Sequence, residues 1–162
     1  MAMTLSLTLT ANGETIEGES TIASSDREDT IECFDFSYGV ASSTEAFSGQ
    51  PAGFHAYAPI VVTKRIDKST PFLWKALTLN ENIEATFRFF RPEPGSGFTE
   101  HFYTIVITDG RVSAIDFDSP DSMDAVVGGH PPRETISFVY NNMIQTHEVS
   151  SVEHQDSFRD RE

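Results

Sequence analysis

The sequence predicts a mainly β protein: an antiparallel β-barrel of about eight strands with one short flanking α-helix and a long projecting loop. Most apolar segments alternate with a period of two, and only one segment has helical spacing. Two hairpin-type dipeptides, Asn12-Gly13 and Asp109-Gly110, follow such segments. The 162 residues are typical of one domain, and 13 Phe, 4 Tyr and 1 Trp supply enough apolar surface for a core.

The first strand is expected at residues 3–10, where leucines occupy every second position between threonines and a serine. Asn12-Gly13 then supplies residues that tolerate the positive φ of a tight turn. A short return strand is expected at residues 15–17. Residues 18–30 are polar and include several acids, so we expect a loop or an irregular edge there.

A second clear strand is expected at residues 31–40, with aromatic and apolar side chains at alternate positions. Residues 41–57 are mostly small or turn-forming, and they predict a long projecting loop rather than a strand. The alternative for residues 41–57 is the flexible tip of a hairpin. Aromatic side chains often supply much of the affinity of an interface. The residues expected to dock on a neighbouring copy are Phe47, Phe54, His55 and Tyr57.

Residues 59–66 predict a buried strand, and the helix follows it. Thr70 is expected as the N-cap, with Pro71 at the first helical position, where a missing N–H costs nothing. Apolar residues at helical spacing continue for about two turns and end before Asn80.

The remaining chain returns to the two-residue period. Asp109-Gly110 predicts a second tight hairpin, and Asn141-Asn142 predicts a bulge in the last strand. Strands are expected at residues 83–90, 98–108, 111–118 and 134–148, with a turn at 92–97, a long loop at 119–133 and a polar tail from Ser150.

Charge argues against two classes of partner. The chain carries 25 Asp and Glu against 11 Lys and Arg, a net charge of −14, which repels nucleic acid and anionic membranes. The one local group of positive residues is read as a solvated strand and helix face, with a phosphate patch as the alternative; it comprises Lys64, Arg65, Lys68 and Lys75. No apolar run predicts membrane insertion or a signal peptide, so we expect synthesis in the cytoplasm.

The residues that could act in catalysis or metal binding do not form a recognisable motif. Cys33 is the single cysteine, and the acidic run 116–121 lacks the glycine and terminal glutamate of a calcium loop. The histidines are scattered without metal-ligand spacing; they are His55, His101, His130, His147 and His154. The sequence therefore predicts no enzyme and no catalytic, cofactor-binding or metal-ligating residue.

Four segments carry a family resemblance. The stretch PIVVTKRIDKSTPFLWKAL, from Pro59 to Leu77, resembles the central part of the haemolysin-coregulated protein (Hcp) family, the inner-tube protein of bacterial type VI secretion systems. The opening LSLTLT with IEGES, the strand IECFDFSYGV and the closing ETISF agree in order. The last strand differs, because residues 141–146 replace the family's usual aromatic ending.

The resemblance implies one Hcp-like barrel domain at residues 1–149, followed by a C-terminal tail at 150–162. It implies a homohexamer whose rings stack head to tail into a tube that a contractile sheath ejects. It also implies a spike protein and effector proteins as partners, with effectors carried in the lumen. The protein would then start in the cytoplasm and be secreted without a signal peptide.

Two other functions fit the same sequence. The tube of a phage tail or of an extracellular contractile particle shares the ring-forming barrel. A monomeric β-barrel that binds a small ligand or a protein needs no assembly. Native mass separates the monomer from the tube proteins.

Overall fold

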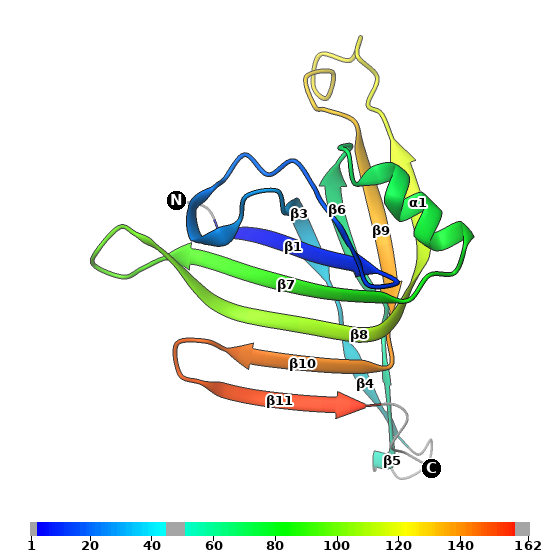
Figure 1. Ribbon diagram of the computed structural model, residues 1–162, viewed down its shortest axis with the longest axis vertical. Coiled ribbons are helices and arrows are strands. Elements are labelled where there is room, and N and C mark those ends of the chain that lie inside the picture. The colour runs from blue at the N-terminus through cyan, green and yellow to red at the C-terminus, as the bar shows by residue number, and fades with distance from the viewer. Residues whose placement is uncertain (1–2, 45–50, 158–162) are drawn as a thin grey trace.

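The computed structural model describes residues 3–44 and 51–157, with side chains described throughout except at residues 43, 44 and 51–54. Strands dominate this part of the chain, in agreement with the predicted fold class (Figure 1). The elements are β1 (Thr4–Ala11), β2 (Glu14–Ile16), the 3-10 helix η1 (Ser24–Asp26), β3 (Ile31–Ser37), β4 (Val40–Thr44), β5 (Pro51–Tyr57), β6 (Ile60–Arg65), α1 (Thr70–Thr78), β7 (Ile83–Pro92), β8 (Thr99–Asp118), β9 (Arg133–Val139), β10 (Asn142–His147) and β11 (Val152–Ser157).

Six antiparallel strands close into a barrel. The sheet runs in the order β11-β10-β8-β7-β1-β3-β6-β9, and β9 pairs back onto β8, which closes the ring. β10 and β11 extend the sheet from β8, outside the closed ring. β2 pairs with β1 and so lies on the opposite side of the sheet from β11. Figure 1 shows this broad sheet in face view, with α1 against one side of the barrel.

The predicted hairpin at Asp109-Gly110 is wrong, because β8 continues through it as one strand of 20 residues. Asp109 does have a positive φ of 51°, as the dipeptide suggests, but the chain bends there instead of reversing. The first half of β8 pairs with β7 and β10, and the second half pairs with β9. A Cβ at Gly110 would lie 2.9 Å from the carbonyl oxygen of Val139, so a glycine is needed for this close packing.

The predicted last strand, residues 134–148, is two strands. β9 ends at Val139, and β10 begins at Asn142 and pairs with the other half of β8. Asn141 lies between them and donates a hydrogen bond of 2.7 Å from Nδ2 to Asp109 Oδ2. The bulge predicted at Asn141-Asn142 is therefore the point where the chain passes from β9 to β10. It lies beside the bend of β8 at Asp109, to which Asn141 is hydrogen-bonded. Residues 152–157 of the predicted tail form β11, which pairs with the whole of β10.

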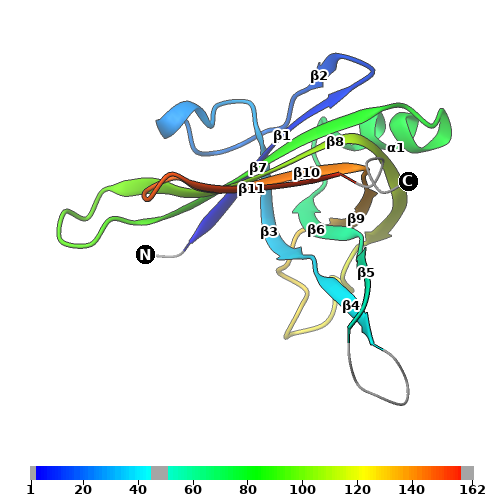
Figure 2. The same ribbon diagram turned by 90° about the horizontal axis from the view of Figure 1, so that it is seen from below.

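The predicted long loop at residues 41–57 is instead largely a hairpin, β4 and β5, which forms a separate two-stranded sheet. Figure 2 shows it projecting from the barrel. Val40, Ala41 and Ser42 are exposed, so the hairpin contributes no buried face at these positions. The two-residue burial pattern that identifies other strands is absent at these three positions, whereas at the base of β5 the half-buried His55 and Tyr57 flank the exposed Ala56.

The barrel interior is apolar, and α1 covers part of it. Leu73 and Ala76 of α1 are buried, as the helical spacing predicts. The helix begins one residue earlier than predicted, at Thr70 with Ser69 as N-cap, and the Thr70 hydroxyl donates a hydrogen bond to Glu134. Fully buried core residues include Leu7, Leu9, Ile31, Ile60, Phe87, Ile107 and Phe138.

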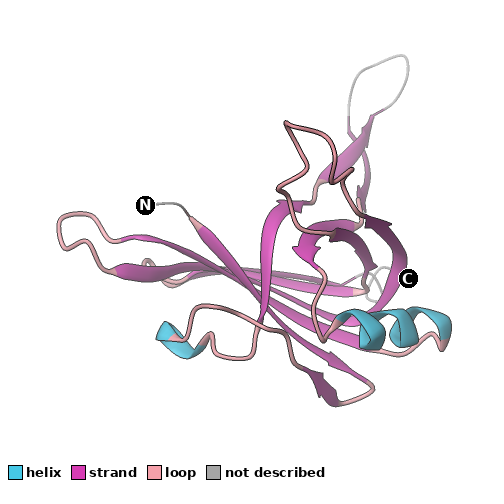
Figure 3. Ribbon diagram, turned by 90° about the horizontal axis from the view of Figure 1, so that it is seen from above, coloured by secondary structure: helices cyan, strands magenta, loops and turns pink. Residues whose placement is uncertain are grey.

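The polar segment between β2 and β3 packs on the outer side of the sheet, where Figure 3 shows η1 well away from α1. Ser6 on β1 donates a hydrogen bond of 2.7 Å to the Thr30 hydroxyl. The Arg27 guanidinium lies 4.1 Å from the centre of the Phe90 ring and is itself buried. Burial lowers the pKa of Arg27, and the nearby Arg88 lowers it further.

Candidate functional site

The base of the projecting hairpin is fixed by one carboxylate. His55 and Tyr57 lie two residues apart on β5, so their side chains share a face. The Tyr57 hydroxyl donates a hydrogen bond of 2.7 Å to Asp156 Oδ2, and His55 Nε2 lies 2.8 Å from the same oxygen. Asp156 lies on β11, so this cluster joins the hairpin to the C-terminal strand. We call these three residues the clamp.

Aromatic rings surround the clamp. The His55 and Tyr57 rings pack edge to face at 5.5 Å, and Tyr57 packs against Tyr140 at 6.0 Å. Tyr140 donates a hydrogen bond of 3.2 Å to the Ala58 carbonyl oxygen, just beyond the end of β5. Burial, with the nearby Tyr57 and Tyr38, raises the pKa of Tyr140 to about 12. The phenol therefore remains a hydrogen-bond donor at neutral pH.

A second junction ties the other side of the hairpin to β10. The Tyr38 hydroxyl, just before β4, donates a hydrogen bond of 2.9 Å to Gln145 Oε1. Tyr103 on β8 donates to the same oxygen at 2.8 Å. Isolated two-stranded hairpins are marginally stable in water, so contacts at both ends of its base stabilise the projecting hairpin.

Two of the four residues predicted to dock on a neighbour, His55 and Tyr57, therefore contact Asp156 of their own chain. Phe54 lies on β5, but its side chain is outside the described ones, and Phe47 is outside the described residues. Their role in an interface stays a prediction. No local pattern in the sequence indicates Asp156, because only the pairing of β11 with β10 brings it to the hairpin.

A basic pocket lies at the far end of β6 and β9. It has a volume of about 240 Å³ and is lined by Phe34, Arg65, His130, Pro131 and Arg133. The Arg65 guanidinium lies 4.9 Å from the centre of the Phe34 ring, which is half exposed. Arg133 is within 3.5 Å of the exposed Asp118 carboxylate.

Buried ionic contacts underlie this pocket. Lys64 and Glu134 face each other in the β6–β9 register and have no exposed side-chain surface, which shows that the expected solvated face is wrong for Lys64. Lys64 Nζ contacts the Glu134 carboxylate and donates to Asp67 Oδ1 at 2.9 Å. The Thr70 hydroxyl donates to Glu134 Oε1 at 2.9 Å, which links the network to α1.

Strand geometry separates the buried and exposed charges. Side chains alternate across a strand, so Lys64 and Glu134 point inward while their chain neighbours Arg65 and Arg133 are exposed. The sequence shows four basic residues close together, but only the closed barrel makes one of them a core residue. Arg65, Lys68 and Lys75 are exposed, as expected.

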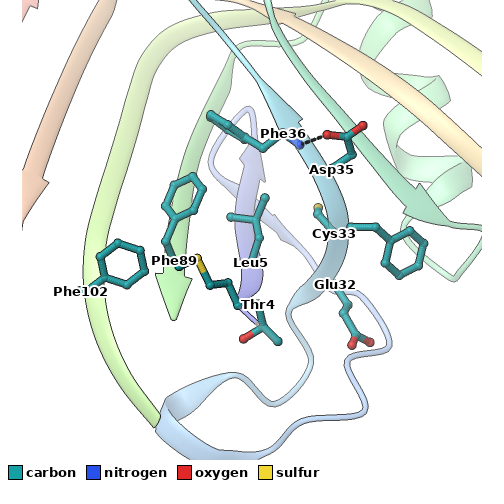
Figure 4. Close-up of a pocket in the computed structure, with 10 residues that line it drawn as sticks. Thr4, Leu5, Glu32, Cys33, Asp35, Phe36, Phe89 and Phe102 are labelled. Carbon is teal, nitrogen blue, oxygen red and sulfur yellow. Dashed lines mark hydrogen bonds between the residues drawn. The ribbon is translucent and has the colours of Figure 1, made fainter. Parts of the chain in front are cut away.

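An apolar groove opens where β1 and β3 separate. The two strands pair only from Leu5 to Leu7, and β3 then shifts register as it pairs with β6. The groove has a volume of about 360 Å³; Figure 4 shows its labelled residues Thr4, Leu5, Glu32, Cys33, Asp35, Phe36, Phe89 and Phe102, and Met3 and Phe34 also line it. The dashed bond in Figure 4 runs from the Phe36 amide to Asp35 Oδ1, at 2.8 Å.

The Cys33 thiol that lines this groove is a poor nucleophile at neutral pH. Burial raises the pKa of this thiol to about 12, so it stays protonated at neutral pH. Within residues 3–44 and 51–157, no three His, Cys, Asp or Glu residues come together as metal ligands. The same residues include no helix with the length and apolar character that a membrane crossing requires.

Comparison with known proteins gives consistent results. Residues 7–147 match the family model described as "Type VI secretion system effector, Hcp". The chain is 31% identical over 133 residues to the "Major exported protein" of Pseudomonas aeruginosa strain PAO1, covering 82% of this chain and 77% of that protein.

Solved structures share the fold over nearly the whole chain. A crystal structure of an Hcp protein superimposes with a TM-score of 0.87 at 25% identity, covering 98% of this chain and 99% of the other. A variant of Hcp1 from E. coli EAEC 042 gives a TM-score of 0.84 at 23% identity and covers 97% and 99% of the two chains. The secreted protein Hcp3 of Pseudomonas aeruginosa gives 0.73 at 22% identity, with coverage of 98% and 99%.

Proposed function

The chain belongs to the Hcp family of type VI secretion proteins, which are structural secreted proteins rather than enzymes, and on this premise we propose that it forms hexameric rings that stack head to tail into the secretion tube. The rings are ejected with the spike protein when a contractile sheath shortens. Effector proteins travel in the lumen. The subunit starts in the cytoplasm and is then secreted by the type VI machine.

The observation that best supports this proposal is the open sheet beside the closed barrel. In the part of the chain that the structure describes, β11 pairs only with β10, and β2 pairs only with β1. These strands lie on opposite sides of the sheet. Exposed strand edges favour pairing with another chain. A contact that uses different surfaces on the two partners repeats from copy to copy, and it closes into a ring or continues as a filament.

The projecting hairpin supports the stacking step. It extends beyond the barrel, and the clamp and the Gln145 junction hold its base. We assign docking on the neighbouring copy or ring to the segment that contains Phe47, Phe54, His55 and Tyr57. His55 and Tyr57 then act at the base by orienting the hairpin, while the two phenylalanines supply apolar contact area.

Deletion of residues 44–55 tests this assignment. Native mass spectrometry measures the ring, and negative-stain electron microscopy with light scattering measures stacking. We expect the deletion to impair assembly, with stacking lost first. Unchanged rings and unchanged stacks would contradict it. A monomer of the wild-type chain at high concentration would favour the alternative function, a monomeric binding module.

A further inference from the structure

We propose that the apolar groove and the basic pocket together form one binding site for a small anionic amphiphile, a molecule with a medium-length apolar body and a carboxylate. The apolar body lies in the groove, and the carboxylate pairs with Arg65. Concave sites that are mostly apolar and carry a few convergent polar groups are typical of small-molecule binding. This role is additional to the proposed function and does not depend on ring assembly.

Phe34 joins the two cavities, because its side chain lines both of them. The pairing of β3 with β6 shifts register between Cys33 and Asp35, and Phe34 lies within this irregularity. Its side chain is 50% exposed, whereas Cys33 is buried. Irregularities of this kind re-aim a side chain relative to the regular strand. A ligand that lies across the exposed Phe34 ring therefore reaches the groove and the pocket together.

The groove suits the apolar body of the ligand. Its volume of about 360 Å³ is more than twice the roughly 150 Å³ of an apolar cavity that holds benzene, which leaves room for a chain of about ten carbon atoms. Besides Phe34, the apolar lining consists of Met3, Leu5, Phe36, Phe89 and Phe102, five of the residues drawn in Figure 4.

Glu32 and Asp35 determine which end of the site the anion occupies. Both line the groove, and neither lines the basic pocket. Glu32 accepts a hydrogen bond of 3.3 Å from the Thr21 hydroxyl, and Asp35 accepts one of 2.8 Å from the Phe36 amide. A ligand carboxylate in the groove would meet like charge, so it is directed to the basic pocket.

The basic pocket contains two arginines that face each other. Arg65 and Arg133 are direct partners in the antiparallel register of β6 and β9. Like charges directly opposite each other on neighbouring strands are unfavourable. Asp118 lies 3.5 Å from Arg133 and partly neutralises that residue, but both side chains of this pair are exposed. An anion bound at Arg65 would relieve the remaining repulsion.

Arg65 is available for the carboxylate. It is exposed, and within residues 3–44 and 51–157 it forms no ion pair. Its guanidinium lies 4.9 Å from the centre of the Phe34 ring, and this contact orients the planar group. An oriented guanidinium can donate two parallel hydrogen bonds to one carboxylate.

A second arginine near the groove is less available. Arg91 lies 4.6 Å from the centre of the Phe102 ring, which lines the groove. Its Nε donates a hydrogen bond of 2.7 Å to Glu100 Oε1, so a carboxylate of the same chain already neutralises it. The anion therefore binds at Arg65 and not at Arg91.

The buried Lys64–Glu134 pair supports the pocket from within the barrel. Lys64 is adjacent in sequence to Arg65, and Glu134 is adjacent to Arg133. Both members of the pair are fully buried, so the ends of β6 and β9 are held together beneath the exposed arginines. A pre-organised site of this kind loses less entropy when its ligand binds.

Three probes distinguish this site from non-specific binding. Decanoate carries the chain and the carboxylate, acetate carries only the carboxylate, and decylamine carries the same chain with a positive head. The net charge of −14 favours the amine at non-specific sites, so a preference for decanoate requires local positive charge. Isothermal titration calorimetry on the full chain, below micelle-forming concentrations, should show decanoate binding about tenfold more tightly than either other probe.

Variants locate the two parts of the site. Arg65→Gln should weaken decanoate binding about tenfold, through loss of charge-assisted hydrogen bonds, and should leave decylamine binding unchanged. Phe34→Ala should weaken decanoate binding by a similar factor, because the ring contacts both parts. Lys75→Gln, at an exposed position on α1, and Arg91→Gln are the matched controls and should retain the wild-type affinity.

The outcomes that would overturn the site are distinct. They are the absence of decanoate binding to the wild-type chain, equal affinities for decanoate and decylamine, an unchanged decanoate affinity in Arg65→Gln, and an equal loss in Arg91→Gln. The comparison of probes uses the wild-type chain alone, so it decides the question even if Arg65→Gln does not fold.

Discussion

Tyr57 on β5 donates a hydrogen bond of 2.7 Å to Asp156 Oδ2 on β11, although 99 residues separate them in the chain. His55 lies 2.8 Å from the same oxygen. The carboxylate therefore connects the two hairpins that extend beyond the closed barrel. The direction of the projecting hairpin depends on the C-terminal strand through this connection.

Asp156→Ala is expected to loosen the projecting hairpin while the barrel stays folded. Loss of a partly exposed hydrogen-bonded charge costs about 1 kcal/mol, so amide exchange in β5 should accelerate about fivefold. Hydrogen exchange with mass spectrometry measures this in residues 51–57. Asp116→Ala, an exposed carboxylate on β8, is the control. Unchanged exchange in β5 would show that the clamp does not hold the hairpin.

The Lys64–Glu134 pair predicts a strong non-additive effect on stability. Lys64→Met leaves Glu134 buried without its cation and should lower the free energy of unfolding by about 3–5 kcal/mol. Lys64→Met with Glu134→Leu should recover most of this loss, because no charge of the pair remains buried. Urea unfolding at a fixed protomer concentration measures both. Lys68→Met, at an exposed ion pair, should cost less than about 1 kcal/mol, and an equally small cost for Lys64→Met would contradict the prediction.

Alkaline pH is expected to destabilise the protein through Cys33 and Tyr140. Burial raises the pKa of each group to about 12, from ordinary values of 9.0 and 10.0, so the unfolded chain ionises first. Their contribution to stability is complete below about pH 9 and is lost as the pH rises to about 12. The urea midpoint should fall across this range, and less steeply in Cys33→Ala. An equal slope in that variant would exclude Cys33 as a cause.

Gly110→Ala is expected to destabilise the corner between the two halves of β8. An added Cβ would lie 2.9 Å from the Val139 carbonyl oxygen and 3.2 Å from that of Ile83, so backbone must move. We expect a loss of about 1–3 kcal/mol in thermal or urea unfolding. Gly39→Ala is the matched control, since no atom lies within 4 Å of a Cβ built there. Similar losses in both variants would show that backbone contact at Gly110 is not the cause.

Stacking of rings is expected to increase with salt. Six copies at −14 each carry −84, and this repulsion acts over about 30 Å at 0.01 M salt but only about 8 Å at 0.15 M. Sedimentation of purified rings across a salt series measures the stacked fraction. Salt-independent stacking would show that complementary charges at the ring faces balance the repulsion.

Much of the barrel could be predicted from the sequence. The alternating leucines of β1 and the alternating residues at the start of β7 indicate which side chains enter the core, because burial leaves a local two-residue pattern. In the strand predicted at residues 31–40 the alternation is wrong at Phe34 and Val40, which are exposed, because the register shifts between Cys33 and Asp35 and Val40 already belongs to β4. The helix after Ser69 was also predicted, within one residue of its start. The hairpin of β4 and β5 was only the alternative to a long loop, because residues 41–57 are mostly small or turn-forming and show no clear two-residue pattern.

The candidate site depends more on distant contacts. His55 and Tyr57 could be selected from the sequence as unusual residues in a segment of small ones, but Asp156 could not. Asp109-Gly110 allows a positive φ, yet the dipeptide does not specify whether the chain reverses or bends. The neighbours β9 and β10 decide this, because each half of β8 finds its own partner.

The sequence by itself determined the mainly β class, the position of the helix and the net negative charge, since each follows from residue type and local spacing. Only the tertiary structure decided that Lys64 is buried while Arg65 is exposed, that β8 turns a corner, and that the hairpin is held by the C-terminal strand. These features depend on which strands pair across long separations. Pairing is selected by the free energy of closing the whole barrel, and no local segment contains that information.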